Sequence, residues 1–333
     1  MRIADMHCDT ISEIWESKRR SKPQTLSQNN LHIDIQKMKQ AGYLLQNFAM
    51  FVDLQKGLDP YAYVKELIAV FYEEIEKNKN DIAVAKCYQD ILNNKEQGKI
   101  SALLTIEEGG CCKGQLENLE LLYQFGARMM TLTWNYPNEL GFPHIMQTQT
   151  QDENTPVANS LCGFDATRGL TKTGFLFVEH MEELGIIVDV SHLSDAGFWD
   201  IARHAKKPFV ASHSNARALC RHRRNLTDEM IRAIAEHGGV VGLNYYGVFL
   251  DEENGQYSSV AKIADHAQHI VQVGGQECLG LGSDFDGFDG GREMENCAQM
   301  EKLIAALEKK GFTGELLDNI LNKNVLRVYR EVL

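Results

Sequence analysis

The sequence predicts a (β/α)8 barrel, a TIM barrel, with a parallel eight-stranded core. Its 333 residues fit the length at which such barrels form one domain, so one domain is expected over residues 1–333. Short apolar, β-branched runs alternate with amphipathic segments, as expected for parallel strands joined by crossover helices. Several runs, such as IIVDV (186–190) and VVGLN (240–244), are nearly continuous in apolar residues, which is typical of parallel strands covered on both faces.

Eight such runs occur, and this repetition favours a barrel over an open, doubly wound sheet. The predicted strands are Arg2–Met6, Leu45–Val52, Ser101–Ile106, Arg128–Thr133, Ile186–Val190, Phe209–Ser212, Val240–Asn244 and Leu279–Gly282.

The segments between the strands have helical patterns, as in YVKELIAVFYEEIEKN (63–78) and KTGFLFVEHMEELG (172–185). Residues 227–239 show the helix signals most fully: Thr227 is a capping residue, acidic residues follow it, and Gly238 ends the segment. Residues 314–333 are expected to form the closing helix. Loops at about 135–165 and 214–225 are the longest breaks after strands, on the side where barrels place their active sites.

Composition excludes several classes of protein. Hydrophobic residues make up 44% of the chain, which supports a large core. The excess of 46 acidic over 34 basic residues argues against nucleic acid or an anionic membrane as the main partner. The N-terminus lacks the apolar core of a signal peptide, and no run approaches the roughly 20 apolar residues of a membrane span. The eight irregularly spaced cysteines are expected to be reduced thiols in a cytoplasmic protein.

Residues of the types that bind metals follow five of the predicted strands. Carboxyl ends of parallel strands meet on one face of a barrel, so these side chains are expected to converge. The residues are His7 and Asp9, Glu107 and Glu108, His192, His213, and Asp284 and Asp286.

Each of these residues has an ordinary alternative role, such as a hydrogen-bonded loop histidine or an aspartate in a turn. Five unrelated roles at the same end of the barrel are a less simple explanation than one common site. Three histidines with two or three carboxylates suit Zn²⁺, with Mn²⁺ or Co²⁺ as alternatives. They exceed the ligands of one four-coordinate zinc, which favours two metals sharing a carboxylate.

Cys8 and the remaining histidines are given other roles. Cys8 points away from its neighbours His7 and Asp9 on an extended strand, so it is expected in the core. His144 and His222 lie in the long loops and stay open. The histidines expected at helix ends or on the surface are His32, His180, His204, His237, His266 and His269.

The motifs together resemble the membrane dipeptidase (renal dipeptidase) family of amidohydrolase-like barrels, over nearly the whole chain. They are DMHCDT (5–10), LLTIEEGG (103–110), TLTWN (131–135), GIIVDVSHLSDAGFWD (185–200), PFVASHSNAR (208–217), CRHRRN (220–225) and LGLGSDFDG (279–287). The resemblance implies a zinc-dependent hydrolase of dipeptides that forms a homodimer.

The resemblance also implies roles for single residues. His7 and Asp9 would bind one metal, His192 and His213 the other, and Glu108, directly before Gly109, would bridge them in preference to Glu107. Asp284 would be the catalytic aspartate that moves a proton and would lie against the substrate. Arg224 would receive the substrate's free carboxylate, a role that suits the guanidinium fork; without the resemblance, Arg224 reads as part of a solvated basic run.

One position departs from the family. Where the renal enzymes have a substrate-holding histidine, this chain has Trp134, which can donate a hydrogen bond but cannot titrate. Either the metals alone polarise the substrate carbonyl, or a loop residue such as His144 takes over. Two alternative functions stay open: a barrel hydrolase of another small substrate, such as a deaminase, lactonase or cyclic amide hydrolase, and a non-catalytic metal- or peptide-binding protein.

Overall fold

Eight parallel strands close into a barrel in the computed structural model, which describes residues 2–20, 22–144 and 167–333. The sheet has nine strands, and pairing of β2 with β4 closes the ring and leaves β3 (Ile82–Val84) outside it. The strands around the ring are β1 (Ile3–Asp5), β2 (Tyr43–Phe51), β4 (Ile100–Glu107), β5 (Ala127–Thr131), β6 (Ile187–Asp189), β7 (Val210–Ala211), β8 (Val240–Leu243) and β10 (Leu279–Leu281).

Each predicted strand corresponds to one strand of the ring, so the predicted (β/α)8 barrel is confirmed. The sequence did not indicate β3, nor the two-stranded sheet of β9 (Tyr257–Ser258) and β11 (Gly291–Arg292). These strands have only two or three residues, too few to show a periodic pattern.

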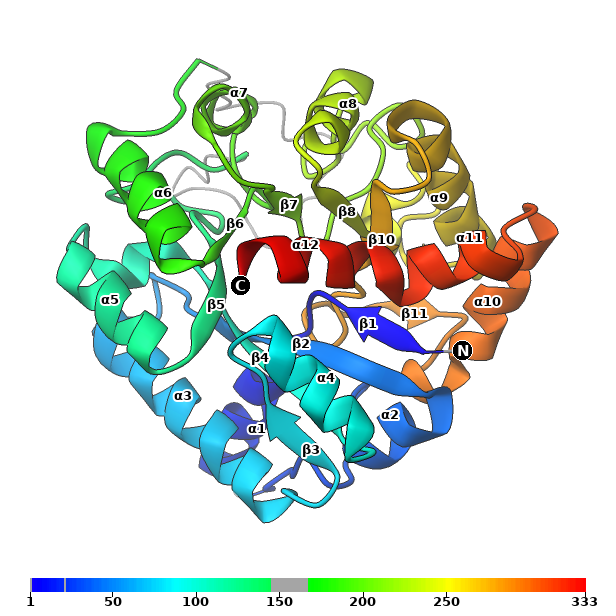
Figure 1. Cartoon of the computed structure of the whole chain (residues 1–333), viewed down its shortest axis with the longest axis horizontal. Coiled ribbons are helices and arrows are strands. Elements are labelled where there is room, and N and C mark those ends of the chain that lie inside the picture. Colours follow the sequence, from blue (N-terminus) through cyan, green and yellow to red (C-terminus); the bar gives the residue numbers. More distant parts are fainter. Residues whose placement is uncertain (1, 21, 145–166) are drawn as a thin grey trace.

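Helices surround the barrel on all sides (Figure 1). They are α1 (Thr10–Arg19), α2 (Ile35–Ala41), α3 (Pro60–Lys77), α4 (Tyr88–Glu96), α5 (Leu116–Gln124), α6 (Lys172–Leu184), α7 (Asp195–His204), α8 (Asp228–Glu236), α9 (Val260–Gly274), α10 (Met300–Lys309), α11 (Gly314–Asp318) and α12 (Asn324–Val332). The start of α8 is as predicted, because the Thr227 side chain accepts a hydrogen bond from the backbone N–H of Met230.

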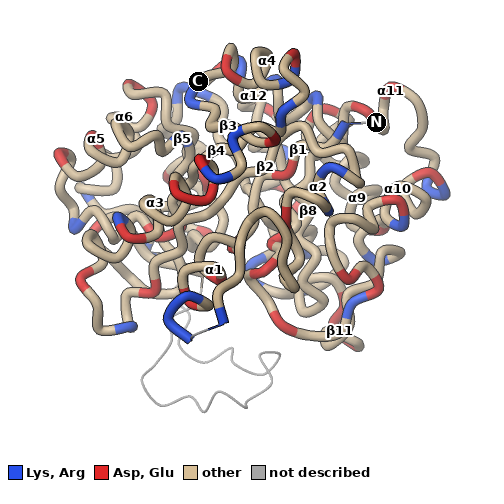
Figure 2. The backbone as a smooth tube through the Cα atoms, turned by 90° about the horizontal axis from the view of Figure 1, so that it is seen from below, with Lys and Arg blue, Asp and Glu red and all other residues tan. Residues whose placement is uncertain are grey.

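The closing helix covers the amino ends of the barrel strands. In Figure 1, α12 crosses the middle of the barrel, and in Figure 2 it lies at the same end of the molecule as both termini. Asn324 donates hydrogen bonds to the backbone of Gln276 and Leu279, just before β10 and at its start. The Tyr329 hydroxyl accepts a hydrogen bond of 2.6 Å from the Asn47 amide, and both side chains are buried. The opposite, carboxyl end of the barrel is left for a functional site.

Three further expectations concern the cysteines, membrane-spanning helices and the long loop after residue 134. The seven cysteines in the described ranges are free, and Cys8 is fully buried with its thiol donating to the carbonyl of Asn47. Within these ranges, no helix is both long enough and apolar enough to cross a membrane. Of the loop expected at 135–165, residues 145–165 lie outside the described ranges.

Candidate active site

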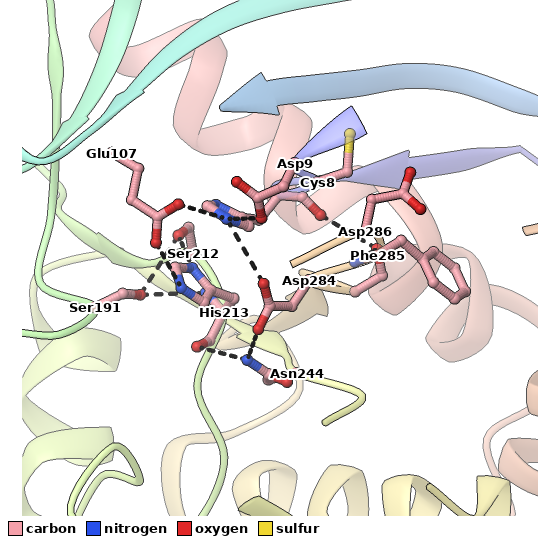
Figure 3. A network of polar contacts seen from close by, with 12 residues as sticks. Cys8, Asp9, Glu107, Ser191, Ser212, His213, Asn244, Asp284, Phe285 and Asp286 are labelled. Carbon is pink, nitrogen blue, oxygen red and sulfur yellow. Dashed lines mark hydrogen bonds and ion pairs between the residues drawn. The ribbon is translucent and has the colours of Figure 1, made fainter. Parts of the chain in front are cut away.

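The end of β1 brings His7 and Asp9 into a buried cluster at the carboxyl end of the barrel. The Nε2 atom of His7 lies 3.3 Å from Oδ2 of Asp9, and both side chains are less than a tenth exposed. Asp5 holds the strand end in place, because its carboxylate accepts from the backbone N–H groups of His7 and Ser283. Figure 3 shows Asp9 facing the cluster and the Cys8 thiol turned away from it.

Glu107 is the glutamate in the middle of the cluster, and the expectation that Glu108 would lie there is wrong. One oxygen of Glu107 lies 3.3 Å from His7 Nε2, and the other lies 3.1 Å from His192 Nε2 and 3.7 Å from His213 Nε2. Alternation along β4 explains the correction. Leu103 packs in the barrel interior with Leu45 and Met129, and counting in twos from Leu103 puts Glu107 on that inner side.

Glu108 points behind the site, where three donors surround its carboxylate. It accepts hydrogen bonds from the backbone N–H of Gly110 (2.7 Å) and of Trp134 (2.9 Å), and from the amide of Asn138. Its backbone has φ 102° and ψ 88°, an unusual conformation for a residue with a side chain. Burial raises the pKa of Glu108 to about 7.

His192 and His213 follow β6 and β7, and their Nε2 atoms lie 3.0 Å apart. The opposite ring nitrogen of each histidine has its own partner. His192 Nδ1 lies 3.1 Å from Oδ1 of Asn135, and His213 Nδ1 lies 2.7 Å from the Ser212 hydroxyl, which donates to Asp189. With Nδ1–H groups donating outward, the lone pairs of both Nε2 atoms face the cluster.

Asp284 follows β10 and completes the cluster. Its Oδ1 lies 3.8 Å from His7 Nε2, and its Oδ2 accepts a hydrogen bond of 2.9 Å from the Asn244 amide. Burial raises the pKa of Asp284 to about 6. Figure 3 shows Asp284, Asp9, Glu107 and His213 directed toward a common centre.

The protonation of the cluster reflects crowding of acids and imidazoles away from water. Burial, reinforced by Glu107, raises the pKa of Asp9 to about 8. Burial lowers the pKa of His192 to about 4 and that of His213 well below its ordinary value. Burial would also lower the pKa of His7, but Glu107 and Asp9 outweigh it and raise that pKa. His192 and His213 are thus held as the neutral imidazoles that metals bind, whereas a metal at His7 and Asp9 would displace the protons that these two groups hold.

The donor set fits divalent metal ions. Three overlapping groups of residues each bring three ligand atoms within 4.8 Å of one another: His7 with Asp9 and Glu107, Glu107 with His192 and His213, and His7 with His213 and Asp284. Among the described residues, Nε2 of His7 and Oδ1 of Asp9 are buried without a hydrogen-bond partner. Buried polar atoms are normally paired, and these two also belong to the groups with metal-ligand spacing, so they fit a bound cation.

Arg224 lies beside the cluster, in the loop between β7 and α8. Its guanidinium donates to the Ser214 hydroxyl (3.1 Å) and to the backbone carbonyl of His213 (3.0 Å). Its side chain is buried, and its Nε has no hydrogen-bond partner in the described ranges. A small pocket joins it to the cluster; the lining includes His144, His192, Ser214 and Arg224.

Trp134 and His144 flank His192 on two sides. The Trp134 ring lies 6.2 Å from that of His192 and contacts Phe51 and Tyr136, so an aromatic wall borders the site there. The His144 ring lies 5.6 Å from His192, and its Nδ1 donates to the His192 carbonyl. His144 is therefore buried beside the site, where the sequence left it open.

Asp286 lies outside the cluster, and two of the remaining histidines lie in other surroundings than the sequence predicted. Asp286 accepts from Thr10 and from the backbone of His32, as a turn residue does. His32 lies in a loop and not in a helix, and His266 is buried and not at the surface. The sequence did not indicate the supporting residues Asn135 and Asn244, because an asparagine near a strand end is also typical of an ordinary turn.

The closed barrel and the imidazole–carboxylate cluster at its carboxyl end define a barrel enzyme with a candidate metal centre. The chain belongs to the membrane dipeptidase family, peptidase family M19, whose model matches residues 1–333. It is accordingly a metallo-dipeptidase of that family, a hydrolase.

Two relatives match most of this chain. A Klebsiella pneumoniae protein from the pqqA 5′ region is 32% identical over 277 residues, covering 82% of this chain and 97% of its own. An uncharacterized dipeptidase of Schizosaccharomyces pombe is 31% identical over 313 residues, covering 90% of this chain and 72% of its own.

Solved structures show the same fold. A metallopeptidase from Rhodobacter sphaeroides, liganded with a phosphinate mimic of the dipeptide L-Ala-D-Ala, superposes with a TM-score of 0.86 at 22% identity, covering 100% of this chain and 99% of its own. A structure described as dipeptidase AC superposes with a TM-score of 0.87 at 23% identity, covering 100% and 98% of the two chains.

Proposed function

We propose that this protein hydrolyses dipeptides by means of two divalent metal ions, with Zn²⁺ as the preferred ion. The observation that carries the proposal is the place of Glu107. Its two oxygens face different imidazoles, His7 on one side and His192 on the other, as a carboxylate shared by two metals must.

The chain's residues divide into two ligand sets around Glu107. His7 and Asp9 would hold one ion, and His192 and His213 the other. When bound, such ions supply a nucleophilic water that ionises near neutral pH and polarise the substrate carbonyl. The Asn135 and Ser212 contacts keep the Nε2 lone pairs of His192 and His213 available for this purpose.

Asp284 would move the proton. Its Oδ2 is fixed by Asn244, while Oδ1 faces the cluster near His7. A carboxyl whose pKa is raised by burial can take a proton from attacking water and give it to the leaving amine. In this scheme Asp284 also borders the substrate.

Arg224 would bind the free carboxylate of the dipeptide. Its Nε has no partner in the described ranges, and its two described acceptors are neutral oxygens, so the buried cation lacks an anionic partner there. A substrate carboxylate could accept two hydrogen bonds from this guanidinium group and neutralise its charge. The dipeptide mimic bound to the Rhodobacter sphaeroides metallopeptidase supports a substrate of this class.

The test combines metal content with turnover of a dipeptide panel. Wild-type protein is expected to hold two ions per chain and to lose hydrolysis on chelation. Glu107→Gln is expected to lose metal and at least about 10³-fold in kcat, and Asp284→Asn to keep metal but lose at least about 100-fold. Full dipeptidase activity in a metal-free sample would refute the proposal.

Another substrate for the same metal centre, such as a lactone or cyclic amide, is the nearest alternative. It predicts no special effect of Arg224 on substrates with a free carboxylate. Assembly as a homodimer and a cytoplasmic location stay predictions from the family resemblance and the sequence; size-exclusion chromatography with light scattering tests the first.

A further inference from the structure

We propose that Glu108 is a positioning residue: its buried carboxylate holds the turn at residues 134–138, and through Asn135 this turn orients His192 toward the metal centre. The inference rests on the proposed metal site and adds a residue behind it. It gives the second glutamate of the Glu107–Glu108 pair a separate function.

The backbone of Glu108 is held in a costly conformation. A φ of 102° in a residue with a Cβ costs about 1–3 kcal/mol, and it persists only where the surroundings enforce it. The side chain is also fully buried, which adds the cost of taking a carboxyl group out of water. Both costs are offset by the three hydrogen bonds that the carboxylate accepts.

Those hydrogen bonds organise the turn that follows β5. Trp134 donates its backbone N–H to one oxygen of Glu108, and Asn138 donates its amide to the other. The amide of Asn138 also donates to the Leu132 carbonyl (2.8 Å), and its Oδ1 accepts from the backbone N–H of Leu140 (2.7 Å). The carboxylate therefore fixes both ends of the turn.

Asn135 lies between these two fixed points and reaches the metal centre. Its Oδ1 lies 3.1 Å from Nδ1 of His192 and sets which ring nitrogen carries the proton. With the proton on Nδ1, Nε2 of His192 is free to bind a metal beside Glu107. Partners of this kind behind a ligand typically change metal affinity or activity 10–100-fold when lost.

Glu108→Gln tests the contact with almost no change in shape. All three partner groups are donors, so the amide N–H₂ of glutamine leaves at least one of them unpaired. We expect one of the two Zn²⁺ ions, that of the His192 and His213 site, to bind 10–100-fold less tightly, measured with Zn²⁺ alone against a chromophoric chelator. We expect kcat to fall by a similar factor, with KM changed less.

A second variant guards against misfolding. Glu108→Gly removes both acceptor oxygens but tolerates the positive φ, so relief of backbone strain offsets part of the cost of the unpaired donors. It is expected to lose at least as much Zn²⁺ affinity as Glu108→Gln, and Tm measured on the same samples separates this loss from unfolding.

Glu182 provides a matched control. It is a buried glutamate at the C-terminal end of α6 that accepts hydrogen bonds from the backbone N–H groups of Lys206 (2.7 Å) and Lys207 (2.9 Å). These residues precede β7 and so lie toward the amino end of the barrel. Glu182→Gln is expected to lower thermal stability while leaving Zn²⁺ affinity and kcat unchanged.

A double-mutant cycle tests the route through Asn135. Asn135→Ala should lose Zn²⁺ affinity as Glu108→Gln does, and the double variant should be little worse than either single one. Additive losses would overturn the route. A Glu108→Gln protein that matches Glu182→Gln would overturn the positioning role, and one that loses both ions, as Glu107→Gln should, would make Glu108 a ligand.

The outcomes separate this inference from the proposed function. A wild-type protein that binds two Zn²⁺ ions but hydrolyses no dipeptide refutes the substrate, and the Zn²⁺ measurements on Glu108→Gln still decide the inference. A wild-type protein that binds no Zn²⁺ refutes both.

Discussion

At the scale of single residues, Arg224 is a buried cation without an anionic hydrogen-bond partner in the described ranges. Burial lowers its pKa to about 10, which still leaves the guanidinium charged at neutral pH. Its ring contact is with Phe249, with the guanidinium carbon 5.4 Å from the ring centroid. A buried charge held by neutral groups gains from an incoming carboxylate, so Arg224 is expected to discriminate between substrates by charge.

Arg224→Ala should therefore lower kcat/KM for free dipeptides far more than for their C-terminal amides. Loss of one partner of a buried, hydrogen-bonded charge pair costs about 2–5 kcal/mol, a factor of roughly 30 to several thousand. Kinetics on matched free and amidated dipeptides measure the difference. Arg221→Ala, at an exposed arginine paired with Glu252, is the control and should change neither value. Equal losses on both substrates would instead favour a lactone- or cyclic-amide hydrolase.

Gly287 is a second residue whose identity the cluster requires. A Cβ at this position would lie 2.4 Å from Oδ1 of Asp284 and 2.4 Å from Oδ2 of Asp9. Both atoms are the ends of side chains, so a Cβ can be accommodated without moving the backbone. The two carboxylates of the candidate site would have to move instead.

Gly287→Ala is expected to reduce kcat about 100-fold, the cost of misplacing reacting groups by about 1 Å. The free energy of unfolding should change by no more than about 0.5 kcal/mol, as for a surface substitution. Turnover and chemical denaturation measure the two effects. Asp289→Ala, at an exposed position of the same loop, is the control. Unchanged turnover in Gly287→Ala would show that Asp9 and Asp284 need not converge.

At the scale of elements, α9 is joined to the loop that carries Arg224 through a buried histidine. His266 accepts a hydrogen bond from the backbone N–H of Ala216 at Nδ1 (3.1 Å), and its Nε2 donates to the Leu250 carbonyl (3.1 Å). Both contacts need the neutral ring. Burial lowers the pKa of His266 from 6.5 to about 4.

This depressed pKa makes stability depend on pH. Because the unfolded chain binds the proton more readily, the contribution of His266 is fully present above pH 6.5 and is lost as the pH falls toward 4. The shift corresponds to about 3 kcal/mol. Denaturation between pH 4 and 7 should show a weaker pH dependence in His266→Gln than in wild type. His180→Gln, at a surface histidine beside Glu120 and Glu183, should keep the wild-type dependence.

At the scale of the whole molecule, the candidate site concentrates acidic groups at one end of an already acidic protein. Asp9, Glu107 and Asp284 all lie within 4 Å of His7 Nε2. Without a cation, these buried carboxyl groups oppose one another, and folding must bear that cost. Bound metal ions would remove it, so metal binding and stability should be linked.

Chelation should therefore lower Tm, and added Zn²⁺ should restore it. Each site contributes about 2.7 kcal/mol when free Zn²⁺ is a hundredfold above its Kd. Calorimetry across a Zn²⁺ titration measures this, and Mg²⁺ should stabilise less because histidine ligands favour zinc. Glu107→Gln should show little response. A chelated wild type with an unchanged Tm that does not respond to Zn²⁺ would contradict the linkage.

Prediction from sequence succeeded where the signal was repeated and local. The eight barrel strands were located because each is a buried apolar run between helical patterns, and their carboxyl ends must share one face. That rule alone brought His7, Asp9, His192, His213 and Asp284 to one rim, and the structure places all five in one cluster.

The choice between Glu107 and Glu108 was decided by tertiary structure. Both are carboxylates beside Gly109, so local chemistry does not separate them. The register of β4 in the closed barrel turns Glu107 inward, and the three donors from Gly110, Trp134 and Asn138 hold Glu108 behind it. The Gly110 donor is local, but Trp134 and Asn138 lie 26 and 30 residues further along the chain, and only folding brings them to Glu108.

The sequence by itself therefore determined the barrel and the types of residue in its site. Both depend on short segments, namely the apolar run of each strand and the polar residues that directly follow it. Tertiary structure decided which glutamate lies at the centre of the cluster, which amide contacts His192, and that Arg224 is buried beside the cluster and not solvated. These depend on contacts between residues far apart in the chain, whose geometry exists only once the barrel has closed.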